Sequence, residues 1–268
     1  MILYASTAKI VEEPLRYEAI TGLDREQLTE LTARVHVRLG GWTSHGRPFV
    51  LGLFNSVTIV VALLRENLTQ SCAGAFFGVS QSTVSRRWDL LRPLIEPALA
   101  EFVPTPAEVA GTSTVLVDGT LIPTWDWKDR DDLYSGKHAD HGFNLQVAGL
   151  WSVHQLVTVG DPVPGARHDA HAWAASGLAD RLADSDVLGD LGYLGCGLVT
   201  GTRKPAGAEI SEDRQLANKA LNAFRARMEH IIAHLKNWKI LSHRYRGPLD
   251  KLGEVIRAIV ALHFFRYS

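Results

Sequence analysis

The chain has 268 residues, 46% of them hydrophobic and 21% charged, a composition typical of a globular protein with one large domain or two smaller ones. Its longest apolar run, residues 48–64, is too short and too polar to span a bilayer, and no basic-then-apolar leader opens the chain, so we expect a cytoplasmic protein. Cys72 and Cys196 form no CxxC pair, which argues against a zinc knuckle or a disulfide framework.

The formal net charge of −1 hides an asymmetry along the chain. Residues 201–268 carry 13 Lys and Arg against 6 Asp and Glu, whereas the first 200 residues carry 15 against 23. A basic C-terminal region is typical of proteins that bind nucleic acid, although a lysine-rich solvated helix gives the same count.

The first hundred residues are expected to form an all-α domain over 1–105. Amphipathic spacing predicts a helix over 23–39, and a nearly all-apolar helix over 49–65 follows the break at Gly40-Gly41. A run that is rich in proline then predicts a linker near 96–110.

Residues 68–92 have the pattern of a helix-turn-helix. A short helix is followed by a turn over 77–80 that contains Gly78, and a second helix starts near Gln81 with Ser80 as its N-cap. An ordinary helical hairpin is the alternative interpretation.

After the linker the periodicity changes to that of an α/β domain, which we expect to cover 110–268. Strands are predicted over 112–118, 120–125, 143–151, 156–160, 186–190 and 197–200, and helices over 169–180, 211–241 and 249–265. Consecutive strands followed by alternating helices and strands indicate a mixed sheet flanked by helices.

Two aspartates each end a short apolar run in this domain. Asp118 follows residues 115–117 and precedes Gly119, and Asp190 follows residues 187–189. In both places an apolar strand brings a carboxylate to the end of the sheet, next to glycines that allow a close turn. A single aspartate in such a position is commonly a turn former, so the pair is more informative than either member.

A third acid lies on a predicted basic helix. At 3.6 residues per turn, Arg225, Glu229 and Lys236 share one stripe, beside an apolar stripe of Leu221, Phe224, Met228, Ile231, Leu235 and Trp238. We interpret Asp118, Asp190 and Glu229 as one metal site, and three carboxylates without clustered His or Cys favour Mg²⁺ or Mn²⁺. The alternative is a salt bridge between Arg225 and Glu229, with Lys236 in solvent.

These residues resemble the signature of DDE-type insertion-sequence transposases, in the branch often called the insertion-sequence-five group. The resemblance is carried by Asp118-Gly119, by Gly189-Asp190-Leu-Gly192-Tyr193 and by Arg225-(3)-Glu229-(6)-Lys236. Blocks similar to those of the group are also present at Tyr134-Ser-Gly-Lys-His138, Gly142-Phe-Asn-Leu-Gln146 and Pro164-Gly-Ala-Arg-His168-Asp169. The likeness covers roughly residues 45–265. One departure is Asn222, which stands where the branch usually has Tyr.

The resemblance implies an RNase H-like catalytic domain in which Asp118, Asp190 and Glu229 hold two Mg²⁺ or Mn²⁺ ions. It implies a transposase that binds terminal inverted repeats, hydrolyses phosphodiester bonds at the element ends and joins the freed 3′-OH to target DNA. The protein would act as a homodimer or higher oligomer on double-stranded DNA. Two alternatives stay open: a domesticated Mg²⁺-dependent endonuclease without strand transfer, and a non-catalytic DNA-binding regulator.

A set of polar and cationic residues is expected to contact DNA. They are Gln81, Ser82, Thr83, Ser85, Arg86 and Arg87 on the second helix of the helix-turn-helix, and Arg225 and Lys236 beside the third acid. At the start of the predicted 169–180 helix, Asp169 is interpreted as an N-cap in preference to a catalytic group. The roles of His168, Trp125 and Trp127 stay open.

Overall fold

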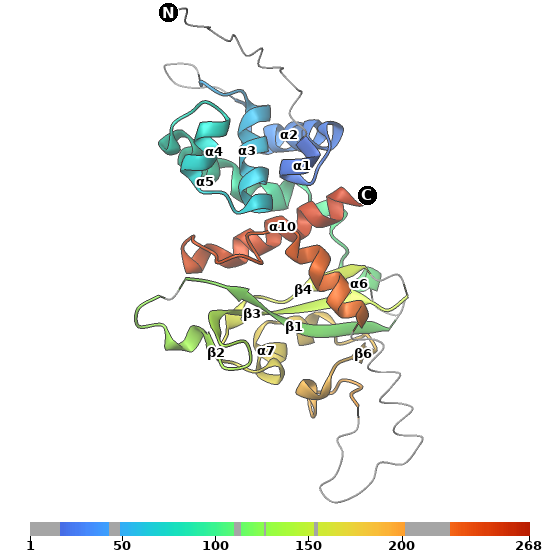
Figure 1. The fold of residues 1–268 in the computed structure, drawn as a ribbon. Coiled ribbons are helices and arrows are strands. Elements are labelled where there is room, and N and C mark those ends of the chain that lie inside the picture. The colour runs from blue at the N-terminus through green and yellow to red at the C-terminus, as the bar shows by residue number, and fades with distance from the viewer. Residues whose placement is uncertain (1–16, 43–48, 110–113, 126, 153–154, 202–225) are drawn as a thin grey trace, which may run out of the picture.

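The computed structural model describes residues 17–42, 49–109, 114–125, 127–152, 155–201 and 226–268. It has a helical N-terminal part and a sheet-containing part below it, with the C-terminal helix between them (Figure 1). The helices are α1 Tyr17–Thr21, α2 Arg25–Leu39, α3 Leu53–Glu66, α4 Gln70–Phe76, α5 Gln81–Ala98, α6 Pro106–Val109, α7 Asp169–Ala175, α8 Leu178–Arg181 and α10 Leu252–Arg266. Residues 226–236 are also helical. The strands are β1 Val115–Pro123, β2 Tyr134–Ser135, β3 Asp140–Leu150, β4 Leu156–Val159, β5 Val163–Pro164 and β6 Val187–Leu188. In the part of the chain that the structure describes, no helix has the length and apolar character needed to cross a bilayer.

The first predicted helix is confirmed, with its start and stop explained by local chemistry. Asp24 and Gln27 form a capping box at the start of α2, since the Asp24 side chain accepts from Gln27 N–H and the Gln27 side chain accepts from Asp24 N–H. Gly40 ends the helix in the left-handed region at φ 72°. The predicted 49–65 helix is present as α3, but it begins four residues later than expected, after Gly52 as its N-cap.

The predicted helix-turn-helix is present as α4, a turn and α5. Gly78 has a φ of +66°, which allows the turn, and the Ser80 hydroxyl accepts from Thr83 N–H at 3.3 Å, as the N-cap assignment requires. A Cβ at Gly74 would lie 2.6 Å from the carbonyl oxygen of Val79, so the close contact of α4 with the turn requires glycine.

The predicted linker starts later than expected, because α5 continues to Ala98 through Pro93 and Pro97. Proline inside a helix removes a backbone hydrogen bond, but Leu91 and Ile95 on the same helix are buried in the core. Packing of this apolar face maintains the helix past both prolines. A 3₁₀ turn and the short α6 occupy most of residues 100–109.

The sheet is mixed and centred on β3, which confirms the expected fold class. β1 pairs antiparallel with β3 from Val115↔Leu150 to Pro123↔Gly142, and β4, β5 and β2 also pair with β3. β6 pairs parallel with β1. Two predicted strands, 112–118 and 120–125, are therefore wrong as separate elements, because one strand continues through Gly119. The predicted strand at 197–200 makes an isolated bridge only, Leu188↔Val199.

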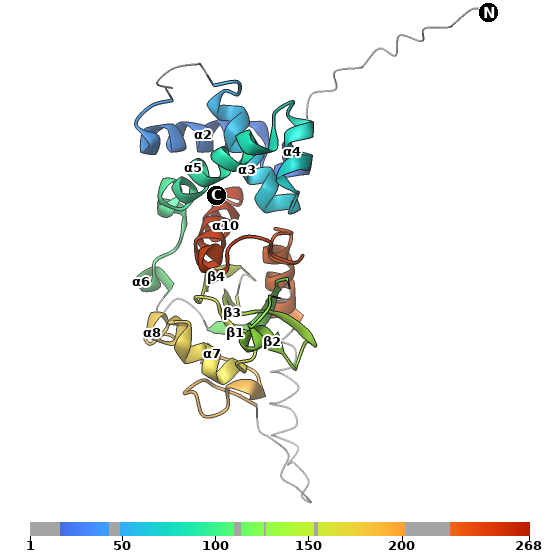
Figure 2. The same ribbon diagram turned by 90° about the vertical axis from the view of Figure 1, so that its left-hand side faces the viewer.

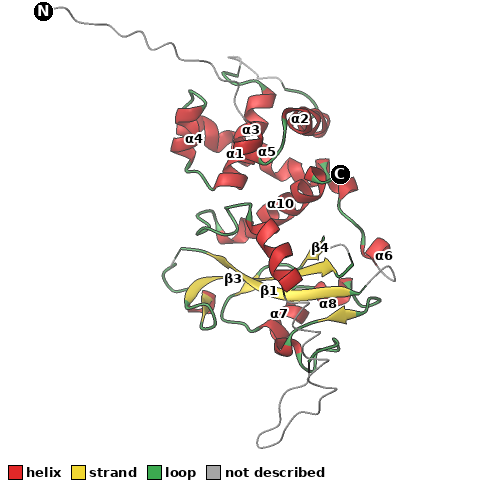
Figure 3. Ribbon diagram, turned by 45° about the vertical axis from the view of Figure 1, so that its right-hand side comes forward, coloured by secondary structure: helices red, strands yellow, loops and turns green. Residues whose placement is uncertain are grey.

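Helices cover both faces of this sheet. The 226–236 helix and α10 lie on one face, and α7 and α8 lie on the other (Figures 2 and 3). The predicted 169–180 helix is broken into α7 and α8 at Gly177, which has a φ of +70°. The predicted 211–241 helix lies outside the described residues up to 225, and its described part ends at 236 and not at 241.

Trp238 lies where the helical part and the sheet-containing part meet. Its side chain is 1% exposed within a core that includes residues of α3, α5 and α10, and the Arg65 guanidinium lies 5.4 Å from its ring centroid. Lys239 N–H donates to the Arg65 carbonyl at 2.8 Å. Two ion pairs between α5 and α10, Arg92–Glu254 and Glu96–Arg257, continue this contact. The division into domains over 1–105 and 110–268 stays a prediction, and the apolar core is continuous across it.

Replacing Trp238 by Ala should destabilise the whole protein. The change removes a fully buried aromatic side chain, so we expect a loss of about 3–5 kcal/mol in the free energy of unfolding, measured by urea denaturation. Trp125→Ala is the matched control, because Trp125 is 54% exposed, and it should change stability by less than about 0.5 kcal/mol. An equal loss of stability in the two variants would contradict a structural role for Trp238 in the core that the helical part and the sheet-containing part share.

Candidate active site

The register between β1 and β6 brings two of the predicted acids together. The parallel pairs are Val115↔Val187 and Leu116↔Leu188, so continuing the same offset places Asp190 level with Asp118. β6 ends at Leu188, and Asp190 instead begins a short 3₁₀ turn, where its Oδ1 accepts from Gly192 N–H at 2.7 Å. The two carboxylates therefore lie at one edge of the sheet on neighbouring chain segments.

The environment of Asp118 disfavours its charged form. Burial raises the pKa of this carboxyl to about 6, and the negative charge of Asp190 contributes to the increase. The hydrogen bond from Gly119 N–H, at 2.8 Å, and the Lys137 ammonium act in the opposite direction. A half-buried carboxylate beside a second one is a typical setting for a bound cation, since the cation would offset both penalties.

Glu229 lies on the helix that covers the same face of the sheet as Asp118. Along β1, side chains alternate between faces, so Asp118 shares the face of Leu116 and Ile122, and these belong to the core that contains Met228 and Ile231. The Glu229 side chain itself is exposed.

The structure does not place Glu229 against the two aspartates. Within the described ranges, no group of three or more acidic, histidine or cysteine side chains is arranged to hold a metal ion. The convergence of Asp118, Asp190 and Glu229 therefore stays a prediction.

The two cations predicted beside Glu229 have different outcomes. Arg225 lies outside the described residues. Lys236 is half-buried, its Nζ donates to the Leu121 carbonyl at 3.0 Å, and burial lowers its pKa. In this structure Lys236 therefore anchors its helix to β1 and does not extend toward solvent as a phosphate contact would.

Most of the predicted DNA-contacting residues on α5 are accessible. Gln81, Ser82 and Arg86 are exposed, and Thr83 and Ser85 are half-buried.

Arg87 is the exception, and its assignment as a DNA contact is corrected. It is 7% exposed, and its guanidinium stacks on the rings of Phe49 and Trp42 at 4.1 and 4.8 Å from their centroids. Its place on α5, three residues after the buried Val84, directs the side chain into the protein. Arg87 therefore packs α5 against the segment that precedes α3.

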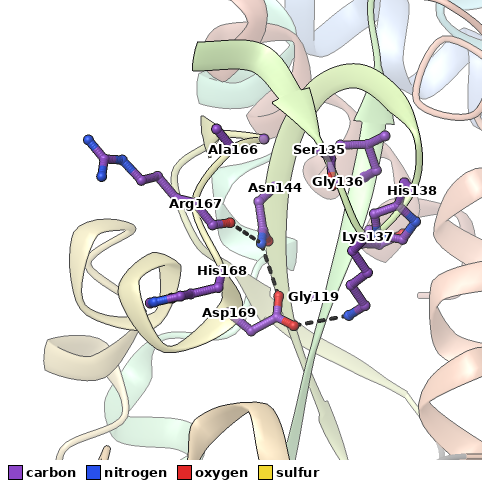
Figure 4. Close-up of a pocket in the computed structure, with 13 residues that line it drawn as sticks. Gly119, Ser135, Gly136, Lys137, His138, Asn144, Ala166, Arg167, His168 and Asp169 are labelled. Carbon is purple, nitrogen blue, oxygen red and sulfur yellow. Dashed lines mark hydrogen bonds and ion pairs between the residues drawn. The ribbon is translucent and has the colours of Figure 1, made fainter. Parts of the chain in front are cut away.

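Asp169 is the site residue that the sequence analysis misassigned. His168 is the N-cap of α7, its Nδ1 accepting from His171 N–H at 3.2 Å, and Asp169 is the first residue of the helix. The Asp169 carboxylate is buried and accepts from Lys137 Nζ at 3.0 Å and from Asn144 Nδ2 at 2.9 Å (Figure 4). These bonds lower the pKa of Asp169 despite its burial.

A pocket of about 280 Å³ opens beside this carboxylate. It lies between the turn at Ser135–His138 and the loop at Gly165–His168, and the β1 residues that follow Asp118 form its floor. In Figure 4 the side chains of Arg167 and His168 point away from Lys137, so the Lys137 ammonium is the cationic group near Asp169 in this view. These residues lie in the three sequence blocks at 134–138, 142–146 and 164–169, which carry part of the family resemblance but predict no role for Lys137 or Asn144.

The residues present fit a divalent cation. Asp118 and Asp190 provide hard oxygen donors, and a bound cation would offset the burial that raises the pKa of Asp118. Such a donor set is typical of Mg²⁺ or Mn²⁺ sites and not of zinc sites.

Comparison with known proteins points to one family. Residues 117–263 match the family described as DDE superfamily endonuclease, and residues 51–100 match the helix-turn-helix of DDE superfamily endonuclease. A protein assigned as the transposase of insertion sequence element IS112 in Streptomyces albus G is 32% identical over 253 residues, 94% of each chain. One assigned as the transposase of insertion sequence element IS702 in Microchaete diplosiphon is 25% identical over 253 residues, 89% of each chain. No solved structure matches the chain.

The raised pKa of Asp118 predicts that removing this carboxylate stabilises the metal-free protein. The folded state binds the proton more tightly than the unfolded state, so stability falls as the pH rises from about 4 to about 6 and remains reduced above that. In EDTA, Asp118→Asn should therefore gain about 1–2 kcal/mol at pH 7.5 and almost nothing at pH 4, by urea unfolding. Asp131→Asn, at an exposed position, is the control. An equal gain in the free energy of unfolding at both pH values would show that ionised Asp118 does not destabilise the folded state.

Proposed function

We propose that this chain, which belongs to the family of DDE superfamily endonucleases, is a DNA transposase that cuts the ends of its own element and joins them to target DNA. The α4–turn–α5 unit would bind the terminal inverted repeats, and the edge of the sheet at Asp118 and Asp190 would carry out the phosphoryl transfer. The protein would act as a homodimer or higher oligomer, with both ends bound.

The observation that carries this proposal is the pairing of Asp118 with Asp190. The parallel register of β1 and β6 is a backbone property, and continued beyond Leu188 it supports a position of Asp190 beside Asp118, although 71 residues separate the two in sequence. In a protein that also has a helix-turn-helix, such a pair supports chemistry on a phosphodiester. An N-terminal helix-turn-helix alone would support only a binding role.

Asp118, Asp190 and Glu229 are the residues that would hold two Mg²⁺ or Mn²⁺ ions. When bound, such ions provide an activated water and stabilise the leaving 3′ oxygen. Asp118 is fixed by β1 and Asp190 by the 3₁₀ turn that it caps. Glu229 would approach from the covering helix, which Lys236 attaches to β1.

Loss of any one acid should abolish cleavage but not binding of the element ends. We expect Asp118→Asn, Asp190→Asn and Glu229→Gln each to reduce single-turnover cleavage of labelled terminal-repeat DNA by at least about 10³-fold in Mg²⁺, because each removes an oxygen donor. Affinity for the end, measured by gel shift, should change less than about threefold. Asp131→Asn is the control. Normal cleavage by Glu229→Gln would remove Glu229 from the site.

The same assay separates the proposed transposase from its two rivals. Joined product from the wild type supports a transposase, cleaved product without joining indicates an endonuclease, and a bound complex without chemistry indicates a regulator. Each product has a different length on a denaturing gel, so the three outcomes are distinguished in one reaction.

Arg86 and Arg87 are adjacent on α5 but should behave differently. Arg86→Gln should weaken end binding and make the slope of log affinity against log salt shallower by about 1, because an exposed cation loses one phosphate contact. Arg87→Gln should instead lower the thermal stability of the protein and leave the salt slope unchanged, because its guanidinium packs on aromatic rings. A reduced slope in Arg87→Gln with normal stability would overturn the corrected assignment.

A further inference from the structure

A buried polar network connects the face of the sheet that α7 and α8 cover to the proposed active site. Tyr193 Oη donates to Gln146 Oε1 at 2.7 Å, and Gln146 Nε2 donates to Asn144 Oδ1 at 2.8 Å. Asn144 Nδ2 and Gln146 Nε2 both donate to Asp169 Oδ1, at 2.9 and 3.4 Å. The other carboxylate oxygen, Oδ2, accepts from Lys137 Nζ at 3.0 Å. Tyr193 and Gln146 are fully buried, so the chain of bonds ends at the Lys137 ammonium, which is at the surface.

Stability alone does not explain the last member of this network. The side chain of Lys137 is 59% exposed, and an ion pair with one exposed partner contributes little to folding. Asn144 and Gln146 already satisfy one oxygen of Asp169 from within the protein. The buried Asp169 carboxylate, held by two side-chain amides, therefore fixes the position of the exposed Lys137 ammonium. Such an arrangement is typical of a side chain that binds a ligand.

Lys137 is connected to the two aspartates of the site through Asp169, whose Oδ2 accepts from its Nζ at 3.0 Å. Partial burial favours its neutral form, but the hydrogen bond to Asp169 and the charges of Asp169, Asp118 and Asp190 raise its pKa above the ordinary value. The ammonium therefore stays protonated at neutral pH in a site that handles a polyanion. The pocket of about 280 Å³ beside it provides open space next to that charge.

Two glycines hold Asp169 close to the aspartates. A Cβ at Gly119, which follows Asp118 directly, would collide with Asp169 Oδ1. A Cβ at Gly192 would lie 2.8 Å from Asp190 Oδ1 and 3.5 Å from Asp169 Oδ2. Gly119, directly after Asp118, and Gly192, two residues after Asp190, thus leave room for Asp169, so the network lies against both aspartates.

We propose that Lys137 binds a backbone phosphate of the DNA strand at the point of cleavage, and that Asp169 is the positioning residue that sets the Lys137 ammonium for this contact. The inference rests on the proposed function, and it names a substrate-binding group of the same site. It also gives the buried network a role, because the network fixes where the ammonium can lie relative to Asp118.

The test replaces single phosphates of the DNA by uncharged methylphosphonates along the strand on both sides of the cleaved bond. With wild-type protein, neutralising the phosphate that Lys137 contacts should slow single-turnover cleavage by about tenfold or more. On natural DNA, Lys137→Gln should reduce the cleavage rate by at least the same factor. When that phosphate is also neutralised, the cleavage rate of the variant should fall by less than about twofold more. At every other phosphate the two proteins should lose equally, which is the pattern of a direct pair in a double-mutant cycle.

Further variants separate the contact from a structural effect. Lys137→Arg should retain most of the cleavage, Lys128→Gln is the control with an exposed lysine, and Asp169→Asn should show the same phosphate dependence as Lys137→Gln but more weakly. The measurements on the Lys137 variants decide the proposal even if the Asp169→Asn variant does not fold. Equal losses for Lys137→Gln and wild type at every phosphate would overturn the proposal. So would a uniform loss in Lys137→Gln accompanied by changed Mn²⁺ affinity, because that result would make Lys137 only a counter-ion for the acids.

A second experiment measures the affinity of each protein for the same methylphosphonate series by gel shift, using pre-nicked ends so that no cleavage is needed. Lys137→Gln should lose affinity for natural DNA, and its salt slope should be shallower by about 1. If wild-type protein did not cleave, the proposed function would fail, and this arm would still decide whether Lys137 contacts a phosphate. Unchanged affinity and slope in Lys137→Gln would reject the contact.

Discussion

The parallel pairing of β1 with β6 is the constraint on which the site depends. It consists of only two residue pairs, Val115↔Val187 and Leu116↔Leu188, and Asp190 follows it by two residues. A shift by one residue would turn Asp118 or Asp190 to the opposite face, because side chains alternate along a strand. The antiparallel ladder of β1 with β3, nine pairs long, fixes β1 itself. The short β6 strand therefore pairs with a β1 strand whose position is already fixed by β3.

Bringing carboxylates together creates a repulsion that the rest of the site is built to manage. Asp169 joins the two aspartates on a segment from the other face of the sheet, and its charge adds to theirs in raising the pKa of Asp118. Lys137 counters that charge without removing it, since the pKa of Asp118 remains raised to about 6. Burial is the largest cause of this raised pKa, and the charges of Asp190 and Asp169 add to it. In the proposed function, a divalent cation would offset these costs, and Lys137 would remain available for a DNA phosphate.

The sequence predicted the backbone better than the direction of the side chains. Ser80, Gly78 and the start of α5 were predictable because capping and positive φ are local properties. Asp118 was expected at the end of a strand, but β1 continues through it to Pro123, because its pairing with β3 does not stop at Gly119. Arg87 could not be placed, because its burial depends on Trp42 and Phe49, which lie some forty residues earlier in the chain. Asp169 was misassigned for a related reason: a helix start suggests capping, and only the fold shows that Asn144 and Lys137 converge on its carboxylate. The third acid stays a prediction, because Glu229 is exposed and no group of three acidic, histidine or cysteine side chains in the described residues is arranged to hold a metal ion.

The attachment of α5 to the rest of the molecule determines which part of it can read DNA. Its C-terminal half is tied to α10 by Arg92–Glu254 and by Glu96–Arg257, and its inner face is packed through Arg87, Leu91 and Ile95. Gln81, Ser82 and Arg86 in its first turns are exposed, as a contact with a groove would require. Because α10 also packs over the sheet through the shared core, the orientation of α5 is coupled to the sheet that carries Asp118. In the proposed transposase, this coupling would link the recognition of an element end by α5 to the position of the bond at the acids.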